Sequence, residues 1–402
     1  MLIVKKFGGS SVADKDRIYN VVERCIEDYE KGNDVVVVLS AMGKTTDGLL
    51  AQAADMNPDA PKRELDMLLA TGEQVSVAMA AMACSAKGVP AISLNAFQVA
   101  MHTTSTYGNS RFKRIDTERI RHELDSRKIV FVTGFQGINK YDDLTTLGRG
   151  GSDTTAVALA AALRADACEI YTDVDGVYTA DPRVVPDAKK LKEITYDEML
   201  EMATLGAKVL HNRSVELAKK YGVQLVVLSS FDKVEGTVVK EVTKLEQMLV
   251  SGVTADKNAA RIAIMGVADE PGIAFRVFDL LAAKNINVDV ILQSIGRDGT
   301  KDISFTVNTT DLKDAVRLLE ENNDKINCQE ILTDENVAKV SVVGAGMQSN
   351  TGVAAGMFEA LYGVGVNIRM ISTSEIRITV LIDEADADKA VRAVHDKFLS
   401  ED

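Results

Sequence analysis

Two glycine-rich loops of this chain carry the cations best placed to bind an anionic ligand. They are Lys6-Phe7-Gly8-Gly9-Ser10-Ser11 and Gly148-Arg149-Gly150-Gly151-Ser152-Asp153, and each lies between a predicted strand and a predicted helix. Glycine lets the backbone approach a ligand closely, and free N–H groups at a helix start attract phosphate or carboxylate. Lys6 would add a point charge, and Arg149 would add a planar fork. Each loop by itself could also be an ordinary capped turn.

Acidic residues could supply the complementary groups. The segment Thr172-Asp173-Val174-Asp175-Gly176-Val177-Tyr178 ends another predicted strand, and Asp181-Pro182-Arg183 then turns the chain. Carboxylates at such a strand end could hold a ribose or order the waters of Mg²⁺. An ordinary β-turn rich in Asp and Gly would have the same sequence pattern. Glu73 precedes a long predicted helix, where it could bind a substrate ammonium or only complement the helix dipole.

Two nucleotide-binding patterns fail on their spacing. Gly43-Lys44-Thr45 resembles the end of a P-loop, but Val38 stands where its first glycine belongs. Gly344-Ala345-Gly346 resembles a dinucleotide fingerprint, but its third glycine position is Ser349. The four histidines have no HxxxH or HExxH spacing and the four cysteines form no CxxC pair, so we expect no protein-held transition metal.

Composition excludes several classes of protein. The chain has 402 residues, of which 46% are hydrophobic and 26% charged, so it can bury cores and is not disordered. Its net charge of −13 argues against general nucleic-acid binding and against adsorption to anionic membranes. No run of 18 apolar residues predicts a membrane span, and no signal peptide is evident. Scattered free cysteines then favour a reducing cytoplasm.

The first half of the chain alternates strands and helices. A strand over 2–7, a helix over 10–31 and a continuously apolar strand over 34–40 are followed by a helix over 62–87. Further strands are expected near 91–94, 129–133, 169–172 and 224–228, and further helices near 117–127, 153–164, 196–204 and 210–221. This order predicts an α/β sandwich around a mainly parallel sheet.

The second half contains two copies of a βαββαβ pattern. The first copy runs from strand 262–267 through helix 272–284, strands 288–294 and 302–308, helix 312–322 and strand 325–332. The second, from strand 338–343 through helix 352–362, strands 367–373 and 376–382 and helix 387–398, stops before a fourth strand. An unpaired edge would remain. We therefore expect the spare strand 247–254 to complete the second copy, so that the first is inserted within it; a simple linker is the alternative.

Six blocks in this order resemble the aspartate kinases of the amino-acid kinase family. They are KFGGSSV at 6–12, VLSAMGKTTD at 38–47, TGE at 71–73, TLGRGGSDTT at 146–155, YTDVDGVYTADPR at 171–183 and the tandem ACT-type repeats. The resemblance implies a monofunctional enzyme with a three-layer αβα kinase sandwich followed by two α+β ACT-type domains. The domains would be kinase 1–240, first ACT 261–333, and second ACT 247–256 with 337–402.

The resemblance also implies a reaction and roles for residues. MgATP and L-aspartate would give 4-phospho-L-aspartate and ADP, the first step towards lysine, threonine and methionine through the diaminopimelate pathway. Lys6 would contact the transferring phosphoryl group, with Asp153 and Arg149 also catalytic. The nucleotide would be held by Lys6, Phe7, Gly8, Gly9, Thr172, Asp173, Tyr178, Arg183 and Lys208. Aspartate would be held by Ser40, Thr46, Glu73, Arg149, Gly150, Gly151 and Ser152.

The ACT repeats would bind end-product amino acids such as lysine or threonine. Candidate effector-binding residues are Asp269, Gly272, Ile273, Ala274, Asn287, Asp289 and Gln293 in the first copy, and Gln348, Asn367, Ser374 and Glu375 in the second. Pairing of ACT domains would give a homodimer or a larger homo-oligomer. Two alternatives stay open: another amino-acid kinase, for acetylglutamate, glutamate or uridylate, and a catalytically silent amino-acid sensor.

Overall fold

The computed structural model describes residues 1–207, 209–241, 249–294, 299–348 and 350–400, and its contacts divide them into two compact units. The first is formed mainly by residues 1–177 and 209–241, together with Lys190–Thr204. The second is formed mainly by residues 249–400, together with Tyr178–Lys189 and Leu205–Ala207. The chain therefore leaves the first unit at Tyr178 and returns to it at Lys190.

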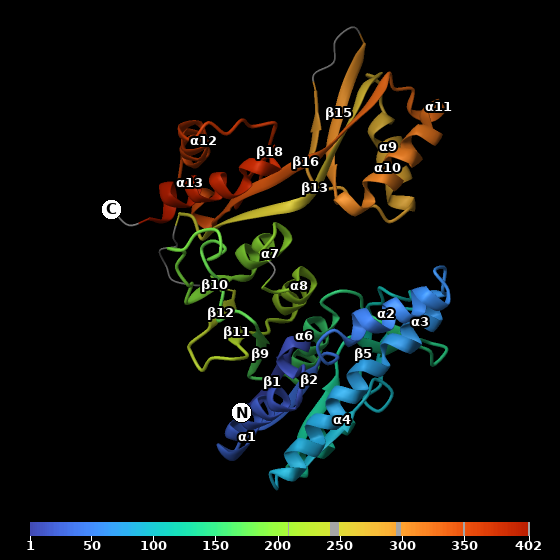
Figure 1. The fold of residues 1–402 in the computed structure, drawn as a ribbon, viewed down its shortest axis with the longest axis vertical. Helices are drawn as coiled ribbons and strands as arrows, with labels where there is room; N and C mark the ends of the chain where they lie inside the picture. The colour runs from blue at the N-terminus through green and yellow to red at the C-terminus, as the bar shows by residue number, and fades with distance from the viewer. Residues whose placement is uncertain (208, 242–248, 295–298, 349, 401–402) are drawn as a thin grey trace. The chain divides into compact units, whose positions relative to one another are not determined.

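The first unit is built on an eight-stranded sheet in the order β10-β12-β11-β9-β1-β2-β6-β3 (Figure 1). All its pairs are parallel except β11 with β12. The strands are β1 Leu2–Phe7, β2 Asp34–Leu39, β3 Ala91–Leu94, β6 Ile129–Thr133, β9 Ala167–Thr172, β10 Glu193–Thr195, β11 Leu225–Ser229 and β12 Thr237–Lys240.

Helices cover both faces of this sheet, which confirms the predicted αβα sandwich. One face packs against α1 and α4 through a core that includes Phe7, Val35 and Val37. Val36 and Val38 alternate with these residues and are fully buried on the other side, where α6 lies against β1, β2 and β9. The helices are α1 Lys15–Glu30, α2 Thr45–Met56, α3 Lys62–Leu69, α4 Thr71–Ala86, α5 Glu118–Asp125, α6 Gly151–Leu163, α7 Tyr196–Thr204 and α8 Asn212–Tyr221.

Three features of the first unit differ from the sequence expectation. The helix expected over 10–31 begins as a short 3₁₀ turn, and α1 starts only at Lys15, after the Asp14 cap. The helix expected over 62–87 is broken at Ala70 into α3 and α4. Helix α2 was not predicted, nor was a small mixed sheet of β4 Met101–Thr103, β5 Phe112–Ile115, β7 Gln136–Ile138 and β8 Leu144–Thr146.

Residues Lys62–Ala86 are long and apolar enough to qualify as a membrane span by length and composition. The fold uses them as α3 and α4, and half of the most apolar window is buried within the protein. The burial of Val77, Ala80 and Cys84 against the sheet accounts for much of that apolar character.

The second unit is built on a six-stranded sheet in the order β14-β15-β13-β16-β18-β17. Two long antiparallel strands, β13 and β16, run through both repeats (Figure 1, yellow and orange). The strands are β13 Gly252–Ala268, β14 Ile291–Gln293, β15 Thr300–Val307, β16 Glu330–Val343, β17 Met370–Thr373 and β18 Arg377–Asp383. The helices are α9 Ile273–Ala283, α10 Leu312–Glu321, α11 Asn323–Ile326, α12 Val353–Gly363 and α13 Ala387–Leu399.

The register of β13 shows how the two repeats share strands. Residues 252–256 pair with 339–343 of the second repeat, whereas residues 261–265 pair with 330–334 of the first. The spare strand expected over 247–254 thus lies in the sheet of the second repeat, although Gln247 and Met248 fall outside the described residues. The strand expected over 325–332 begins only at Glu330, because Lys325 ends the short helix α11.

Candidate active site

The carboxyl ends of β1, β2, β6 and β9 meet at one edge of the parallel sheet, which is where α/β folds bind ligands. Lys6 is near the end of β1, and Asp153 is in the first turn of α6. The Lys6 Nζ lies 2.7 Å from Asp153 Oδ1, and both side chains are 12% exposed. Two residues that the sequence placed on different loops therefore form a nearly buried ion pair that still reaches solvent.

The first glycine loop is locked against the loop that follows β2. The Gly43 N–H donates to the Gly9 carbonyl at 2.9 Å, and a Cβ on Gly9 would lie only 2.8 Å from the Ala41 carbonyl oxygen. Only glycine fits at position 9 without moving the backbone. Gly8 is different, because a Cβ there would meet only Lys6 Nζ, at 3.5 Å. The backbone at Gly8 therefore faces the Lys6 ammonium.

Serine hydroxyls join the end of β2 to the start of α6. The Ser40 hydroxyl donates to the Ser152 hydroxyl at 2.9 Å. The Ser40 carbonyl accepts a bond from the Ser76 hydroxyl on α4 at 2.8 Å. Thr46 is half-buried in the first turn of α2. These contacts bring Ser40 and Ser152 together with the ends of both glycine loops.

Glu73 is buried in the first turn of α4, with 2% of its surface exposed. Its Oε1 accepts a bond from the Ala41 N–H at 3.2 Å, while its Oε2 has no hydrogen-bond partner among the described residues. Burial raises the pKa of Glu73 to about 7. A buried carboxylate oxygen without a donor costs free energy, so this group is suited to receive a donor from a ligand.

The second glycine loop has a left-handed backbone at two positions. Gly148 has φ +79° and Gly150 has φ +67°, a region that residues with a side chain rarely adopt. Arg149 lies between them and is exposed, and the described residues offer its guanidinium no ion pair. Gly151 begins α6, so the loop delivers Arg149 and the helix N-terminus to the same place.

The predicted nucleotide-binding residues are divided between the two compact units. Thr172 ends β9, and its hydroxyl donates to Asp173 at 3.0 Å. Phe7 is fully buried and stacks on Tyr171 at 4.3 Å, so its side chain belongs to the core and only its backbone is available to a ligand. Tyr178 and Arg183 lie in the second compact unit, where Arg183 pairs with Asp181 at 2.7 Å. Lys208 lies outside the described residues.

Comparisons with known proteins identify the family of this chain. An amino acid kinase family model matches residues 1–229, and an ACT domain model matches residues 262–322 and 340–398. The aspartokinase of Corynebacterium glutamicum is 51% identical over 403 residues, which cover 99% of this chain and 96% of that protein. The chain belongs to the amino acid kinase family, among its aspartokinases. It carries two ACT domains.

Two solved structures of this family are similar to the whole chain. One is E. coli aspartokinase III in complex with aspartate and ADP (R-state), with a TM-score of 0.83, 27% identity and full coverage of both chains. The other is the same enzyme in complex with lysine and aspartate (T-state), with a TM-score of 0.77 and 28% identity. It covers 99% of this chain and 100% of that one.

The ACT unit places the effector candidates at the helix starts and strand ends of each repeat. Gly272 and Gly352 precede α9 and α12 with φ +97° and +96°, so the two repeats start their helices in the same way. Asp269 pairs with Lys301 at 3.0 Å, and Asp289 pairs with Lys339 at 2.7 Å. Both carboxylates are thus already matched by a lysine of the chain itself.

The remaining effector candidates differ in exposure. Ile273 is buried in the core of the first repeat, so only its backbone is available to a ligand. Ala274 is half-buried at the start of α9. The Ser374 N–H donates to the Arg377 carbonyl at 2.8 Å in a turn that also contains Glu375. The side chain of Gln348 lies outside what the structure describes. The exposed candidates are Asn287, Gln293, Asn367, Ser374 and Glu375.

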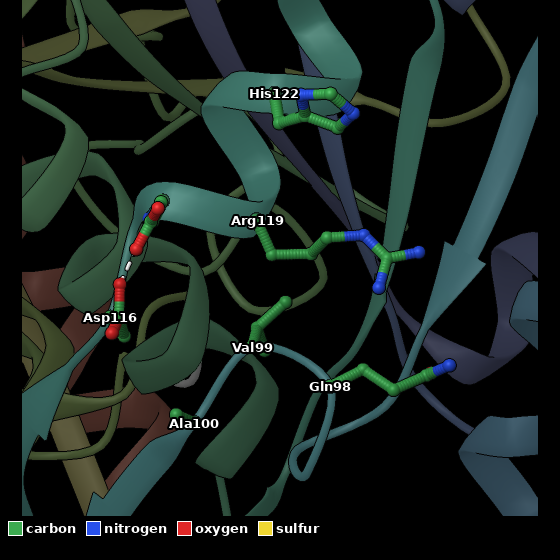
Figure 2. Close-up of a pocket in the computed structure, with 7 residues that line it drawn as sticks. Gln98, Val99, Ala100, Asp116, Arg119 and His122 are labelled. Carbon is green, nitrogen blue, oxygen red and sulfur yellow. Dashed lines mark hydrogen bonds between the residues drawn. The ribbon is translucent and has the colours of Figure 1, made fainter.

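A separate hollow of about 330 Å³ lies beside the start of α5 (Figure 2). Its lining includes Gln98, Ala100, Asp116 and His122, together with Arg119, which pairs with Glu123 at 2.7 Å. None of the predicted site residues lines it. Within the described residues, no group of three His, Cys, Asp or Glu side chains is arranged to hold a metal ion.

His211 is a neighbour of the site that sequence reasoning missed. It directly precedes α8, and its ring packs against Gly150 of the second glycine loop. Its spacing from the other histidines fits no metal site, so the sequence gives no chemical reason to single it out. Nothing local in the sequence predicts that a residue about sixty positions after the loop folds against it.

Proposed function

We propose that this chain transfers the γ-phosphoryl group of ATP to the β-carboxylate of L-aspartate, giving 4-phospho-L-aspartate and ADP. This would be the first step of the diaminopimelate pathway towards lysine, threonine and methionine. The observation that carries the proposal is the Lys6–Asp153 ion pair, held at the carboxyl edge of the sheet between two glycine loops. A cation there, with backbone N–H groups beside it, suits a phosphoryl group in transfer.

The chemistry needs no protein base. The β-carboxylate of aspartate is ionised at neutral pH, and one of its oxygens attacks the γ-phosphorus. The new O–P bond forms as the bond between the γ-phosphorus and the β,γ-bridging oxygen breaks, and ADP leaves with that electron pair. Lys6 and the N–H groups of Gly8 and Gly9 neutralise the transferring oxygens. Asp153 keeps the Lys6 ammonium aimed at them.

Aspartate would be held by its two charged ends. The exposed guanidinium of Arg149 would clamp the α-carboxylate, and the unpartnered Oε2 of Glu73 would accept a hydrogen bond from the α-ammonium. Ser40, Thr46 and the backbone of Gly150, Gly151 and Ser152 would orient the rest. Placing both substrates in line supplies much of the rate enhancement.

The nucleotide would lie against the end of β9, with Thr172 and Asp173 near its ribose and Tyr178, Arg183 and Lys208 completing the site. Mg²⁺ would arrive with ATP. The Asp153 carboxylate fits a role beside the ion, because it is the acidic group at the glycine loops and remains 12% exposed. When bound, the ion supplies further charge neutralisation on the phosphates.

Regulation and assembly belong to the same proposal. The eleven effector candidates would bind lysine, threonine or both. The domains would be kinase 1–240, apart from the segment 178–189 that packs in the ACT unit, first ACT 261–333, and second ACT 247–256 with 337–402. A homodimer or larger homo-oligomer would form through the ACT sheet, whose edge strands expose Ile291, Leu292 and Ile371. Three buried free cysteines, Cys25, Cys84 and Cys168, are consistent with a cytoplasmic location.

Hydroxylamine trapping tests the reaction directly. The chain is incubated with MgATP, hydroxylamine and either L-aspartate or acetylglutamate, without effector and then with lysine, threonine and their mixture. Aspartyl hydroxamate formed only with aspartate is the expected result, and the inhibition pattern identifies the effector. Hydroxamate from acetylglutamate would indicate another amino-acid kinase. No hydroxamate at all, with an amino acid still raising the melting temperature, would favour the sensor.

A further inference from the structure

The start of α8 is fastened to the second glycine loop by two side chains. The first is Arg213, whose Nη1 donates to the Leu147 carbonyl at 2.9 Å and whose Nη2 donates to the Ser110 carbonyl at 2.7 Å. Leu147 is the residue immediately before the loop. The guanidinium of Arg213 therefore connects the residue before the loop to the segment that contains Ser110.

The second side chain is His211, whose ring packs against the backbone of the loop at Gly150. A Cβ built on Gly150 would lie 2.2 Å from His211 Cγ and 2.4 Å from its Cδ2, so the ring is in direct contact with the glycine backbone. The backbone that carries the ring is itself held in place, because the His211 carbonyl accepts bonds from the Ser214 N–H at 2.9 Å and the Ser214 hydroxyl at 2.6 Å.

The environment of His211 favours the neutral form of its ring. Burial lowers the pKa of His211, Asp153 opposes this shift, and Arg213 adds to it. Its Nδ1 is buried and has no hydrogen-bond partner among the described residues.

We propose that His211 and Arg213 are positioning residues that set the second glycine loop, and with it Arg149, for binding aspartate. Gly150 adopts φ +67° one residue after Arg149. The contact of the His211 ring with Gly150 therefore fixes the direction in which the Arg149 side chain leaves the backbone. Arg213 fixes the loop at its other end. The inference rests on the proposed function, in which Arg149 binds the substrate α-carboxylate.

The test compares steady-state kinetics of His211→Ala, Arg213→Lys and the control Lys220→Ala, which removes an exposed cation from the far end of α8. We expect the KM for aspartate to rise about tenfold in the first two variants, since a displacement of about 1 Å near reacting groups is costly. The KM for ATP should stay within about twofold of the wild-type value, and the control should match wild type. A loss of stability alone would reduce the active fraction without moving one KM selectively.

A double substitution tests the contact itself. Gly150→Ala should nearly abolish aspartate use, because the new methyl group would overlap the ring of His211. In the His211→Gly background, which also removes the Cβ of residue 211 that lies 2.5 Å from the built methyl group, the same change should cost at least about tenfold less, because only the strained φ remains. If Gly150→Ala does not fold, the KM values of Arg213→Lys for aspartate and ATP decide the question.

Equal effects of Gly150→Ala in both backgrounds would overturn the inference. So would an unchanged aspartate KM in His211→Ala and Arg213→Lys, or an equal rise in the KM for ATP. A wild-type chain that forms no aspartyl hydroxamate would refute the proposed function instead, and this result is separate from any comparison among variants.

Discussion

Lys6 and its neighbour Lys5 show how one strand uses alternate residues for different purposes. Lys6 faces α6 and pairs with Asp153, whereas Lys5 faces α1 and is 1% exposed. Lys6→Ala should lower kcat by about 100- to 1,000-fold, because a charge aimed at the transferring group is lost. The melting temperature should fall by less than in a variant of Lys5, because only one carboxylate, Asp153, loses its cation. Hydroxamate formation measures the rate, and Lys140→Ala, an exposed lysine, is the control.

A Lys6→Ala variant that turns over at the wild-type rate would refute the role assigned to Lys6.

Arg149→Ala should change the kinetics in a different way. Its guanidinium would contact the α-carboxylate rather than the phosphoryl group, so the KM for aspartate should rise by about 10- to 100-fold, as expected when a charge-assisted contact is lost. The KM for ATP should stay close to the wild-type value. Equal rises in both values would contradict the assignment.

Glu73 predicts the pH dependence of aspartate binding. Burial raises its pKa to about 7, so below that pH the group is neutral and attracts the substrate ammonium less. The KM for aspartate should therefore rise by up to about tenfold for each pH unit below 7 and level off above it. Glu73→Gln should show a high KM that does not change between pH 6 and 8. A wild-type KM that is flat over that range would contradict the assignment.

The same shift also predicts the stability of the ligand-free protein. Because the fold favours the protonated form of Glu73, its contribution to stability is complete below the ordinary pKa of 4.5 and is lost as pH rises through about 7. Aspartate should offset this loss by supplying a donor. Its effect on the melting temperature should therefore grow from pH 6 to pH 8, and Glu73→Gln should remove that growth.

At the scale of elements, a buried ion network joins β1, β9 and α1. Lys5 Nζ lies 2.6 Å from Asp28 and 2.9 Å from Glu169, and it donates to the Tyr171 hydroxyl at 3.2 Å. Burial opposes the charge, but Glu169 and Tyr171 hold the pKa of Lys5 above its ordinary value. Lys5 therefore stays charged, and its contacts orient the strand that also carries Lys6.

Lys5→Met should destabilise the protein by about 3 kcal/mol, because two carboxylates would lose their cation. Both carboxylates keep 18% exposure, which places the effect at the low end of the range for buried pairs. Urea unfolding measures the change. Adding Glu169→Gln to the variant should recover part of the loss, because one uncompensated charge disappears. A double variant less stable than Lys5→Met would contradict this account.

At the scale of the whole molecule, part of the kinase sequence belongs to the ACT unit. In Tyr178–Lys189, Ala180 and Val185 are buried in the core of the second repeat. The Val253 N–H donates to the Thr179 carbonyl at 2.7 Å, and the Thr179 hydroxyl lies 2.9 Å from Nε2 of the buried His395. A chain cut after residue 241 would therefore keep this segment but lose everything it packs against.

We expect residues 1–241 expressed alone to be cleaved within 178–189 by limited proteolysis under conditions that leave the full chain intact, because exposed loops are the preferred cleavage sites. In the full chain, His395→Leu should give intermediate cleavage there, since it removes the buried hydrogen bond to Thr179. The exposed His122→Leu is the matched control. Equal resistance of the truncated and full chains would show that the segment is stable without the ACT unit.

The sequence by itself determined the αβα sandwich, the strand exchange between the ACT repeats and the loops that carry Lys6 and Arg149. These features depend on local signals: the apolar runs of parallel strands, glycines at strand-to-helix turns, and the count of strands in each repeat. The pairing of the start of β13 with the second repeat follows from the same count of strands, because an unpaired sheet edge is unfavourable.

Only the tertiary structure decided which distant residues meet. His211 lies against Gly150, Glu73 keeps one carboxylate oxygen without a donor among the described residues, and Arg183 lies in the ACT unit. Helix α2 and the small mixed sheet were also missed, because short elements carry weak periodicity. Contacts between residues far apart in the chain depend on packing and closure of the whole unit, and no local pattern encodes them.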